Sequence, residues 1–356
     1  MSRMTNPIPL RVSAPGRICL FGEHQDYLGL PVIAAAIDLR IELAATPRAD
    51  ALFVVEMPDI GERLELDPNM ENRYRHGHDY LPAAANVLRR EGLSWTTGYD
   101  VTVTSGIPIN AGASSSSALQ VAWCALLLAA AGDPRAGDAE SIARVAHQSE
   151  VTEFDSPGGM MDHFSSAVGG AIWLDCRPPY AVTDLPAWMG EFVLVESGIP
   201  KDTNGVLGEK RRRAESLGAE QLLDNADTSQ LSAADRAIRE AVVQNRKLTL
   251  AARALIETSE DADLLGVLLS RHHDQLSRNL GVSLPEIDRL LARGIGAGAL
   301  GGKINGSGCG GSFFLMCPGQ GARIAALYRG VGLSAHVVRI GKGVAVEADQ
   351  RMELTS

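Results

Sequence analysis

A run of four serines, Ser114 to Ser117, stands directly before a strongly apolar stretch and constrains how this part of the chain can fold. The stretch reads GIPINAGASSSSALQVAWCALLLAAAG over residues 106–132, and its apolar spacing predicts a helix over Ser116–Leu128. The first N–H groups of a helix lack acceptors within the helix, and Gly112 permits a tight turn just before them. Hydroxyls and free amides at this positive helix end suit phosphate oxygens, and a serine hydroxyl also suits magnesium.

Two interpretations of the serine run remain open from this segment alone. One serine caps the helix and the others are solvated, although capping accounts for one serine and not for four. Alternatively, the run binds phosphate. The Walker pattern GxxxxGK[ST] is absent from the chain, so a phosphate loop here belongs to another class.

The composition is that of a globular chain with an acidic balance. The 356 residues are 45% hydrophobic, which is enough for a substantial core, and this length predicts two domains or one large one. The formal net charge of −10 opposes binding to a phosphate backbone, because nucleic-acid-binding proteins usually present a basic face. We therefore expect no nucleic-acid partner.

The cysteines and the apolar runs indicate the compartment. Five scattered cysteines without a CxxC pattern fit neither a disulfide framework nor a zinc cluster, and they favour a reducing cytosol. The N-terminal residues lack the apolar core of a signal peptide. The longest apolar run, Val121–Ala131, is about half of the roughly 20 residues that a membrane span requires. We expect a soluble, cytoplasmic protein with no membrane partner.

The order of the predicted elements mixes strands and helices. Runs rich in branched residues predict strands at Arg11–Ser13, Val32–Ile37, Leu52–Glu56, Tyr99–Thr104, Gly169–Asp175 and Phe192–Glu196. Helical spacing predicts helices at Ser116–Leu128, Asp138–His147, Asp235–Thr258, Ala262–Leu276 and Leu284–Arg293. The proline-bearing segment CRPPYAVTDLPAWMG, residues 176–190, is predicted as a linker, with a domain boundary near Met189.

A second glycine-rich segment, GKINGSGCGGSFFLM, contains a GxGxxG pattern at Gly306, Gly308 and Gly311. A dinucleotide fingerprint follows a strand and opens a helix, whereas SFFLM after these glycines predicts a strand. A Rossmann dehydrogenase is therefore disfavoured. The glycines imply close backbone approach, either to another segment in a packed turn or to a ligand phosphate.

A third segment, APGRICLFGEHQDYLG, places four polar side chains within ten residues: Arg17, Glu23, His24 and Asp26. Carboxylates and imidazole donate to or accept from several hydroxyls at once, so this density predicts a site for a hydroxyl-rich ligand. A solvated loop is the alternative. The nearby RYRHGHDY brings together His76, His78 and Asp79, but no further ligand is identifiable, and we expect a polar loop there rather than a metal site.

Together the three segments resemble the GHMP small-molecule kinases, and within that superfamily they look most like the galactokinases. The segment SEVTEFDSPGGMMDHF resembles the stretch that carries the galactokinase catalytic aspartate, and the resemblance covers almost the whole chain. It implies an α+β class and a two-domain GHMP kinase fold. An N-terminal domain over residues 1–188 would resemble ribosomal protein S5, a C-terminal domain over residues 189–356 would be ferredoxin-like, and the active site would lie between them.

The resemblance also implies roles for individual residues. Asp162 matches the catalytic aspartate and also contacts the sugar, while Arg17 matches its basic neighbour. Ser116 and Glu150 match the magnesium ligands, whose oxygen chemistry a hard cation prefers. The residues expected to wrap the phosphates of ATP are Gly112, Ala113, Ser114, Ser115, Ser116 and Ser117. The residues expected to hold sugar hydroxyls are Glu23, His24 and Asp26.

The chain departs from the galactokinase pattern where the sugar is expected to bind. Gln25 replaces the usual threonine, Ser117 replaces a small alanine, and GEKRRRAES places Glu209 where the sugar-contacting tyrosine would be. Exchanging a flat aromatic ring for a carboxylate changes both packing and charge. An amino sugar or a pentose is therefore also plausible as the substrate.

The interpretation is an enzyme that uses magnesium and ATP to phosphorylate the anomeric hydroxyl of galactose or a related sugar, as a monomer or homodimer. One alternative is a GHMP kinase for another small alcohol, such as mevalonate, which LFGEH loosely resembles. A second alternative is a regulator that binds sugar and ATP without turnover. Such a regulator should lack a catalytic group, whereas Arg17, Ser116, Glu150 and Asp162 are all present.

Overall fold

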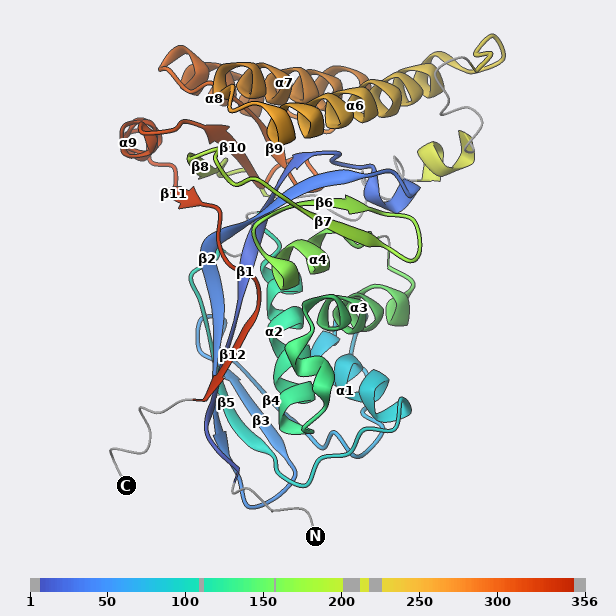
Figure 1. Ribbon diagram of the computed structural model, residues 1–356, viewed down its shortest axis with the longest axis vertical. Helices are drawn as coiled ribbons and strands as arrows, with labels where there is room; N and C mark the ends of the chain where they lie inside the picture. Colours follow the sequence, from blue (N-terminus) through green and yellow to red (C-terminus); the bar gives the residue numbers. More distant parts are fainter. Residues whose placement is uncertain (1–6, 109–111, 157, 201–211, 218–225, 349–356) are drawn as a thin grey trace.

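The computed structural model describes residues 7–108, 112–156, 158–200, 212–217 and 226–348. Within these ranges the chain forms two sheets, and Figure 1 shows them succeeding one another along the longest axis of the molecule. Helices cover both sheets. The α+β class predicted from the sequence is confirmed.

The larger sheet contains eight strands within the described residues. Its main path runs β12-β1-β2-β5-β3-β4, while β6 pairs with β2 and β7 pairs with β6. The strands are β1 (Leu10–Phe21), β2 (Val32–Pro47), β3 (Phe53–Met57), β4 (Glu62–Leu66), β5 (Tyr99–Ser105), β6 (Ala171–Asp175), β7 (Ala181–Leu185) and β12 (Ala345–Ala348).

Four longer helices pack against this sheet in two tiers. They are α1 (Tyr80–Arg90), α2 (Ser115–Ala130), α3 (Ala139–Glu150) and α4 (Met161–Val168). Helices α2 and α4 contact β1 and β2, while α1 and α3 pack on α2. Because α2 lies between the sheet and other helices, it is apolar nearly all round, which explains its sequence LQVAWCALLLAA.

The smaller sheet has the strand order β11-β8-β10-β9. Its strands are β8 (Glu191–Glu196), β9 (Gly301–Asn305), β10 (Ser312–Met316) and β11 (Ala335–Arg339). Its helical elements are α6 (Ala233–Thr258), α7 (Ala262–Asp274), η4 (Gln275–Leu280), α8 (Pro285–Gly296) and α9 (Gly321–Arg329). Along the chain, helices α6 to α8 lie between β8 and β9, and α9 lies between β10 and β11. This strand order and these crossovers confirm the ferredoxin-like arrangement expected of the C-terminal part.

Strands β1 and β2 connect the two parts of the molecule. The first half of β2, Val32–Ile37, is continuously buried, because α4 contacts it from one part and α6 contacts it from the other. The β1 prediction was too short, since Arg11–Ser13 is only the start of a twelve-residue strand. A register shift between Pro15 and Arg17 accommodates the proline, which has no N–H to donate. The strand therefore continues to the site segment.

The segment 176–190, predicted as a linker, is not an unstructured connection. It contains β7, which pairs antiparallel with β6. Leu185 is the only one of the five β7 residues that is buried, so the segment has little of the apolar alternation that predicts a strand. We retain the domain boundary at 188/189 as a proposal. Strand β12, far along the chain, belongs to the larger sheet.

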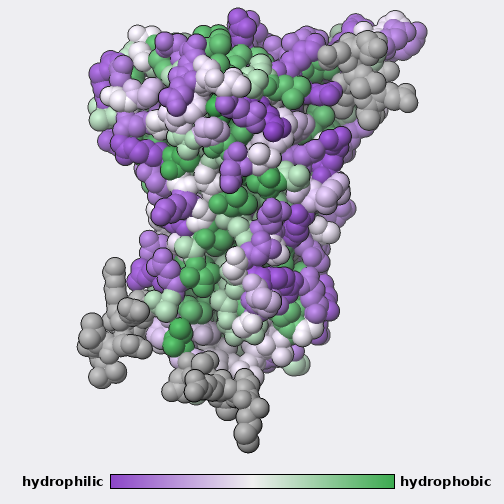
Figure 2. All heavy atoms as spheres, viewed as in Figure 1, coloured by the Kyte–Doolittle hydropathy of each residue, from purple (hydrophilic) through white to green (hydrophobic). Residues whose placement is uncertain are grey.

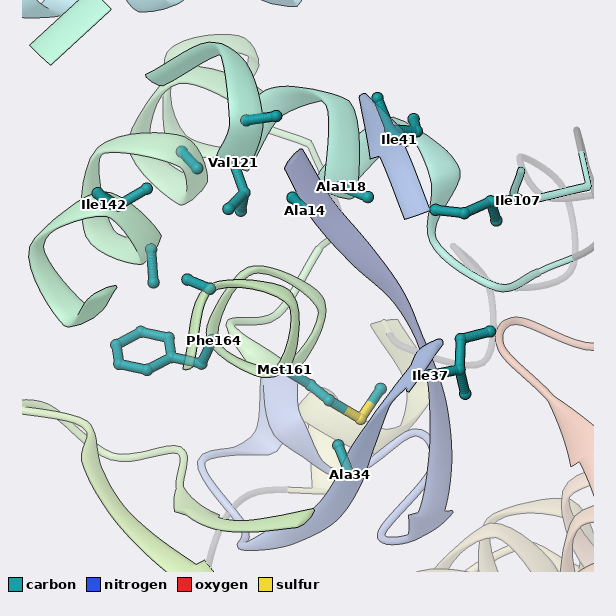
Figure 3. Packing of buried hydrophobic residues seen from close by; sticks show 14 of the residues in the cluster. Ala14, Ala34, Ile37, Ile41, Ile107, Ala118, Val121, Ile142, Met161 and Phe164 are labelled. Carbon is teal, nitrogen blue, oxygen red and sulfur yellow. The ribbon is translucent and has the colours of Figure 1, made fainter. Parts of the chain in front are cut away.

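Helix α4 is anchored by apolar residues on both sides of Asp162. Met161 and Phe164 are 4% and 0% exposed, and Figure 3 shows Met161 extending toward Ala34 of β2. In the same view Val121 and Ala118 of α2 lie beside Ala14 of β1. This packing fixes the first turn of α4 against the sheet, so the position of Asp162 is determined by the core.

Among the described residues, no helix combines the length and the apolar character needed to cross a bilayer. On the face seen in Figure 2, hydrophilic residues predominate and hydrophobic residues gather along the narrow middle, where the two parts of the molecule meet.

Candidate active site

A cavity of about 290 Å³ lies where segments from both parts of the chain meet. Its walls come from the end of β1 and the turn after it, the starts of α2 and α4, the end of α3, and the loop after β9. Eight of the residues predicted for the site line this cavity: Arg17, Glu23, His24, Asp26, Ser116, Ser117, Glu150 and Asp162. The chain thus brings together groups from segments far apart in sequence.

Arg17 and Asp162 form the central ion pair of the cavity. Arg17 Nε donates to Asp162 Oδ1 at 2.7 Å, and Ser114 Oγ donates to Asp162 Oδ2 at 2.6 Å. The Asp162 side chain is 30% exposed and the Arg17 side chain is 4% exposed. Burial disfavours the Asp162 carboxylate, but the charge of Arg17 and the two hydrogen bonds outweigh it and lower its pKa to about 2. Asp162 is therefore ionised at neutral pH.

The backbone before α2 is held by the same arginine and by the C-terminal part. Gly112 O accepts from Arg17 Nη1 at 2.7 Å and from Asn305 Nδ2 at 3.0 Å, while Ala113 O accepts from Arg17 N at 3.1 Å. Gly112 has φ of 72°, and a Cβ there would lie 2.8 Å from Asn305 O. Glycine is required because the loop passes this close to β9. Gly112 and Ala113 do not line the cavity but fix its wall.

The N–H groups at the start of α2 have no side-chain cap, so the capping interpretation of the serine run does not hold for its first residue. Ser114 is the N-cap, in the left-handed region with φ of 57°, and its side chain makes no cap hydrogen bond. Its hydroxyl is used by Asp162 instead. Ser115 begins the helix, one residue earlier than predicted, and is half-buried outside the cavity wall, whereas Ser116 is exposed and lines the cavity. The amide end of α2 is therefore available to an anion.

Glu150 and His163 form a second polar pair in the wall. His163 Nε2 lies 2.8 Å from Glu150 Oε2, and His163 is 2% exposed. His147 packs edge-on against His163 at 5.3 Å between ring centroids. Burial and then the charge of His163 lower the pKa of His147 to about 3, so His147 is neutral. His163 was not predicted as a site residue, although it follows Asp162 directly in the sequence.

The donor set at Ser116 and Glu150 fits magnesium in its chemistry, because both groups offer oxygen. Within the described ranges, no three His, Cys, Asp or Glu side chains gather closely enough to hold a metal ion by themselves. A cation at Ser116 and Glu150 would therefore need further oxygen ligands from phosphate or water.

The acidic segment also lines the cavity. Glu23 Oε2 accepts from Lys303 Nζ at 2.6 Å, and His24 has φ of 62° with its Nδ1 lying 3.3 Å from Tyr27 Oη. Burial and the neighbouring charge of Asp162 raise the pKa of Asp26 from 3.8 to about 6. Gly159 leaves room for this carboxylate, since a Cβ there would lie 1.9 Å from Asp26 Oδ2. Lys303 was also missed from the sequence.

The remaining sequence candidates have other positions. Asp79 pairs with Arg75 at 2.9 Å, and His78 lines the cavity beside Tyr80, its Nδ1 2.7 Å from Tyr80 Oη. The GxGxxG loop is followed by β10, as predicted, and contributes Gly306 to the wall. Glu209 lies outside the described residues.

Three family matches follow the same order along the chain. Residues 3–47 match the galactokinase galactose-binding signature, residues 79–170 match the GHMP kinases N terminal domain, and residues 251–329 match the GHMP kinases C terminal family.

Two curated relatives and one solved structure extend the similarity over nearly the whole chain. A galactokinase from Roseiflexus sp. is 31% identical, covering 84% of this chain and 81% of its own. A mevalonate kinase from Pyrococcus furiosus is 28% identical, covering 94% of this chain and 97% of its own. The galactokinase of Lactococcus lactis, solved in complex with galactose, superposes with a TM-score of 0.80 at 21% identity, covering 95% of both chains.

The cavity at the junction of two α+β parts and these matches define a small-molecule kinase. The chain belongs to the GHMP kinase family. It is a galactokinase-like member, a phosphotransferase with an alcohol group as acceptor, and GHMP kinases use ATP as phosphate donor.

Proposed function

We propose that this kinase transfers the γ-phosphoryl group of ATP to the anomeric C1 hydroxyl of galactose or a closely related sugar. The observation that carries the proposal is the Arg17–Asp162 pair, which lines the same cavity as the start of α2 and the acidic segment around Glu23. The match of residues 3–47 to the galactose-binding signature supports the sugar as acceptor.

In this mechanism Asp162 orients the C1 hydroxyl and accepts its proton as the oxygen approaches the γ-phosphorus. A carboxylate with a pKa of about 2 is a weak base. Phosphoryl transfer passes through a loose transition state, however, so positioning contributes more than proton abstraction. Arg17 holds Asp162 in place and offsets negative charge on the transferred group.

The other site residues bind the two substrates. Amides at the start of α2 and the hydroxyls of Ser116 and Ser117 would contact the phosphates, and the preceding residues from Gly112 to Ser115 would hold this helix end in place. Ser116 and Glu150 would hold Mg²⁺, which neutralises charge on phosphate oxygens. Glu23, His24 and Asp26 would accept or donate hydrogen bonds to sugar hydroxyls.

A smaller adjoining cavity of about 160 Å³ suits the purine ring of ATP. It shares Ser116, His78 and Tyr80 with the main cavity, so a triphosphate passing Ser116 could connect the two. Its other lining residues include the apolar Met57, Ile60, Leu64 and Leu119. A flat aromatic base is stabilised by such apolar contacts.

The test is release of ADP by the purified protein with Mg²⁺ and ATP across a panel of acceptors. Galactose, galactosamine, N-acetylgalactosamine, arabinose, glucose and mevalonate are compared at equal concentrations. We expect the highest turnover with galactose, and the product identified as the 1-phosphate by NMR. Turnover with mevalonate alone would overturn the proposal in favour of the second candidate, which the similarity to the Pyrococcus mevalonate kinase supports. Binding of sugar and ATP without turnover would indicate a regulator instead.

A further inference from the structure

Lys303 of β9 is a fully buried lysine that reaches across to the substrate segment. Its side chain is 0% exposed, and Nζ donates to Glu23 Oε2 at 2.6 Å and to Cys19 O at 2.8 Å. Nζ also lies 5.3 Å from the centre of the Phe314 ring. Both hydrogen-bond acceptors of the ammonium group therefore lie in β1 or just after it, some 280 residues earlier in the chain.

Burial of this pair is costly, so stability alone does not explain it. Moving an ammonium group and a carboxylate out of water costs several kcal/mol per ion, and replacing such a pair by apolar residues is often neutral or stabilising. The neighbouring strand residues show that apolar packing is available here, since Ile304 and Phe314 are each 0% exposed. A charged pair at this position points to a requirement for the charge of Glu23.

The pair restrains Glu23 and leaves it in contact with the cavity. Glu23 is 3% exposed and lines the cavity, although Oε2 is occupied by Lys303. The carboxylate can therefore offer Oε1 to a ligand, with its plane fixed by the lysine. A pre-oriented acceptor binds a hydroxyl at a lower entropic cost than a mobile one.

We propose that Lys303 is a positioning residue for recognition of the acceptor substrate. It keeps the Glu23 carboxylate oriented toward a substrate hydroxyl without touching the substrate itself. Because the lysine belongs to β9 and the glutamate to the segment after β1, recognition also depends on the docking of the two parts of the chain. This inference rests on the proposed function of the cavity, namely that Glu23 contacts the acceptor.

The position of the contact predicts which kinetic constant changes. In the proposed mechanism Asp162 binds the reacting hydroxyl and Glu23 binds another, so the hydrogen bond of Glu23 contributes equally to the bound substrate and to the transition state. Loss of such uniform binding raises KM and leaves kcat unchanged. For Lys303→Met we expect the KM of the acceptor to rise by about tenfold to a hundredfold, with kcat within about threefold and the KM of ATP unchanged.

The experiment compares four variants with the wild type, using whichever acceptor the wild type turns over. Lys303→Met removes the charge at similar length. Lys303→Arg keeps the charge and should recover much of the affinity. Lys303→Met combined with Glu23→Gln removes the uncompensated carboxylate and should regain thermal stability without regaining acceptor affinity. Ile304→Val is the control on the same strand, and we expect its KM values to be unchanged.

Two results would overturn the inference. One is an acceptor KM within twofold of wild type in the folded Lys303→Met or double variant. The other is an equal rise in the KM of ATP and of the acceptor, which a general loosening of the fold would produce. Binding of the acceptor without ATP, measured by calorimetry, gives the same comparison without turnover. Wild-type turnover of mevalonate instead of a sugar would refute the proposed function while leaving the role of Lys303 measurable with that acceptor.

Discussion

Two cation–carboxylate pairs border the same cavity but differ in the exposed fraction of the carboxylate side chain. In the Arg17–Asp162 pair the carboxylate side chain is 30% exposed, whereas in the Lys303–Glu23 pair it is 3% exposed. Asp162 accepts hydrogen bonds on both oxygens, and Glu23 is bound through Oε2. The more exposed Asp162 carboxylate can therefore meet a reacting atom, whereas the nearly buried Glu23 carboxylate can only orient a ligand.

A buried ion pair therefore has no fixed function, and the type of cation matters. Arginine supplies a planar fork that contacts Asp162 and the Gly112 carbonyl at once, so it organises a wall of the cavity. Lysine supplies a point charge that fits between Glu23 and the Cys19 carbonyl. The following variants test this contrast, beginning with the largest expected effect.

Asp162→Asn should abolish most turnover while retaining the binding of sugar and ATP. We expect kcat to fall by at least about a hundredfold, because the variant loses a positioned acceptor for the proton. Assays of ADP release measure kcat, and calorimetry measures the binding of sugar and of ATP. Asp175→Asn is the matched control, since Asp175 also pairs with an arginine, Arg177, but lies outside the cavity wall. Full activity of Asp162→Asn would refute the contrast between the two pairs.

Glu150→Gln should raise the Mg²⁺ concentration that ATP binding requires. Removing one negative ligand lowers affinity for a divalent cation, and we expect the Mg²⁺ concentration for half-maximal binding of ATP to rise by roughly tenfold. Fluorescence titration of a nucleotide analogue measures this without turnover. Glu153→Gln serves as control because Glu153 is held by Arg90 and Tyr74. An unchanged Mg²⁺ requirement would remove Glu150 from the proposed metal site.

Asp26→Asn should stabilise the fold near neutral pH and impair sugar binding. The folded-state pKa is raised from 3.8 to about 6, so the native state binds more protons than the unfolded state between these values. Stability is therefore lost as the pH rises through this window, and the variant avoids the loss. Urea unfolding should show a gain in the free energy of unfolding of about 3 kcal/mol at pH 7.5 and of less than about 1 kcal/mol at pH 4. A gain equal at both pH values would contradict the electrostatic cause.

Ser114→Ala should have the smallest effect of the four. It removes one hydrogen bond to Asp162, and we expect the free energy of unfolding at pH 7 to fall by about 1 kcal/mol. Asp162 has a lowered pKa, so its contribution to stability is present above its unfolded pKa of 3.8 and is lost as the pH falls toward 2. Acid unfolding of the variant should therefore begin at a higher pH. Ser115→Ala keeps both bonds of Asp162, and an equal shift in that control would refute the assignment.

The sequence predicts features that are local, and the site contains several that are not. The helix after the serine run and the density of polar groups around Glu23 are visible because neighbouring residues carry the pattern. The partner of Glu23 is not visible, since Lys303 lies in β9 and an isolated lysine in a strand predicts nothing. Likewise, the serine run could not show that Ser114 Oγ would bind Asp162 rather than cap α2.

Strand β7 shows a different limit on what the sequence can predict. Its pairing with β6 is set by backbone hydrogen bonds, while four of its five side chains are not buried, so the apolar pattern on which a strand prediction depends is absent. The prolines that precede it reinforce the interpretation as a loop. Tertiary pairing overrides the local signal here.

The pairing of β12 with β1 has a consequence for the order in which the protein is made. Residues Leu10–Ser13 leave the ribosome more than 300 residues before their partners Ala345–Ala348. During synthesis the β1 edge is an unpaired strand edge, which is open to pairing with other nascent chains. Asn305, which holds the Gly112 carbonyl, also arrives late. The nascent chain therefore completes its site only after Asn305 has been made, and its larger sheet only after β12 has been made.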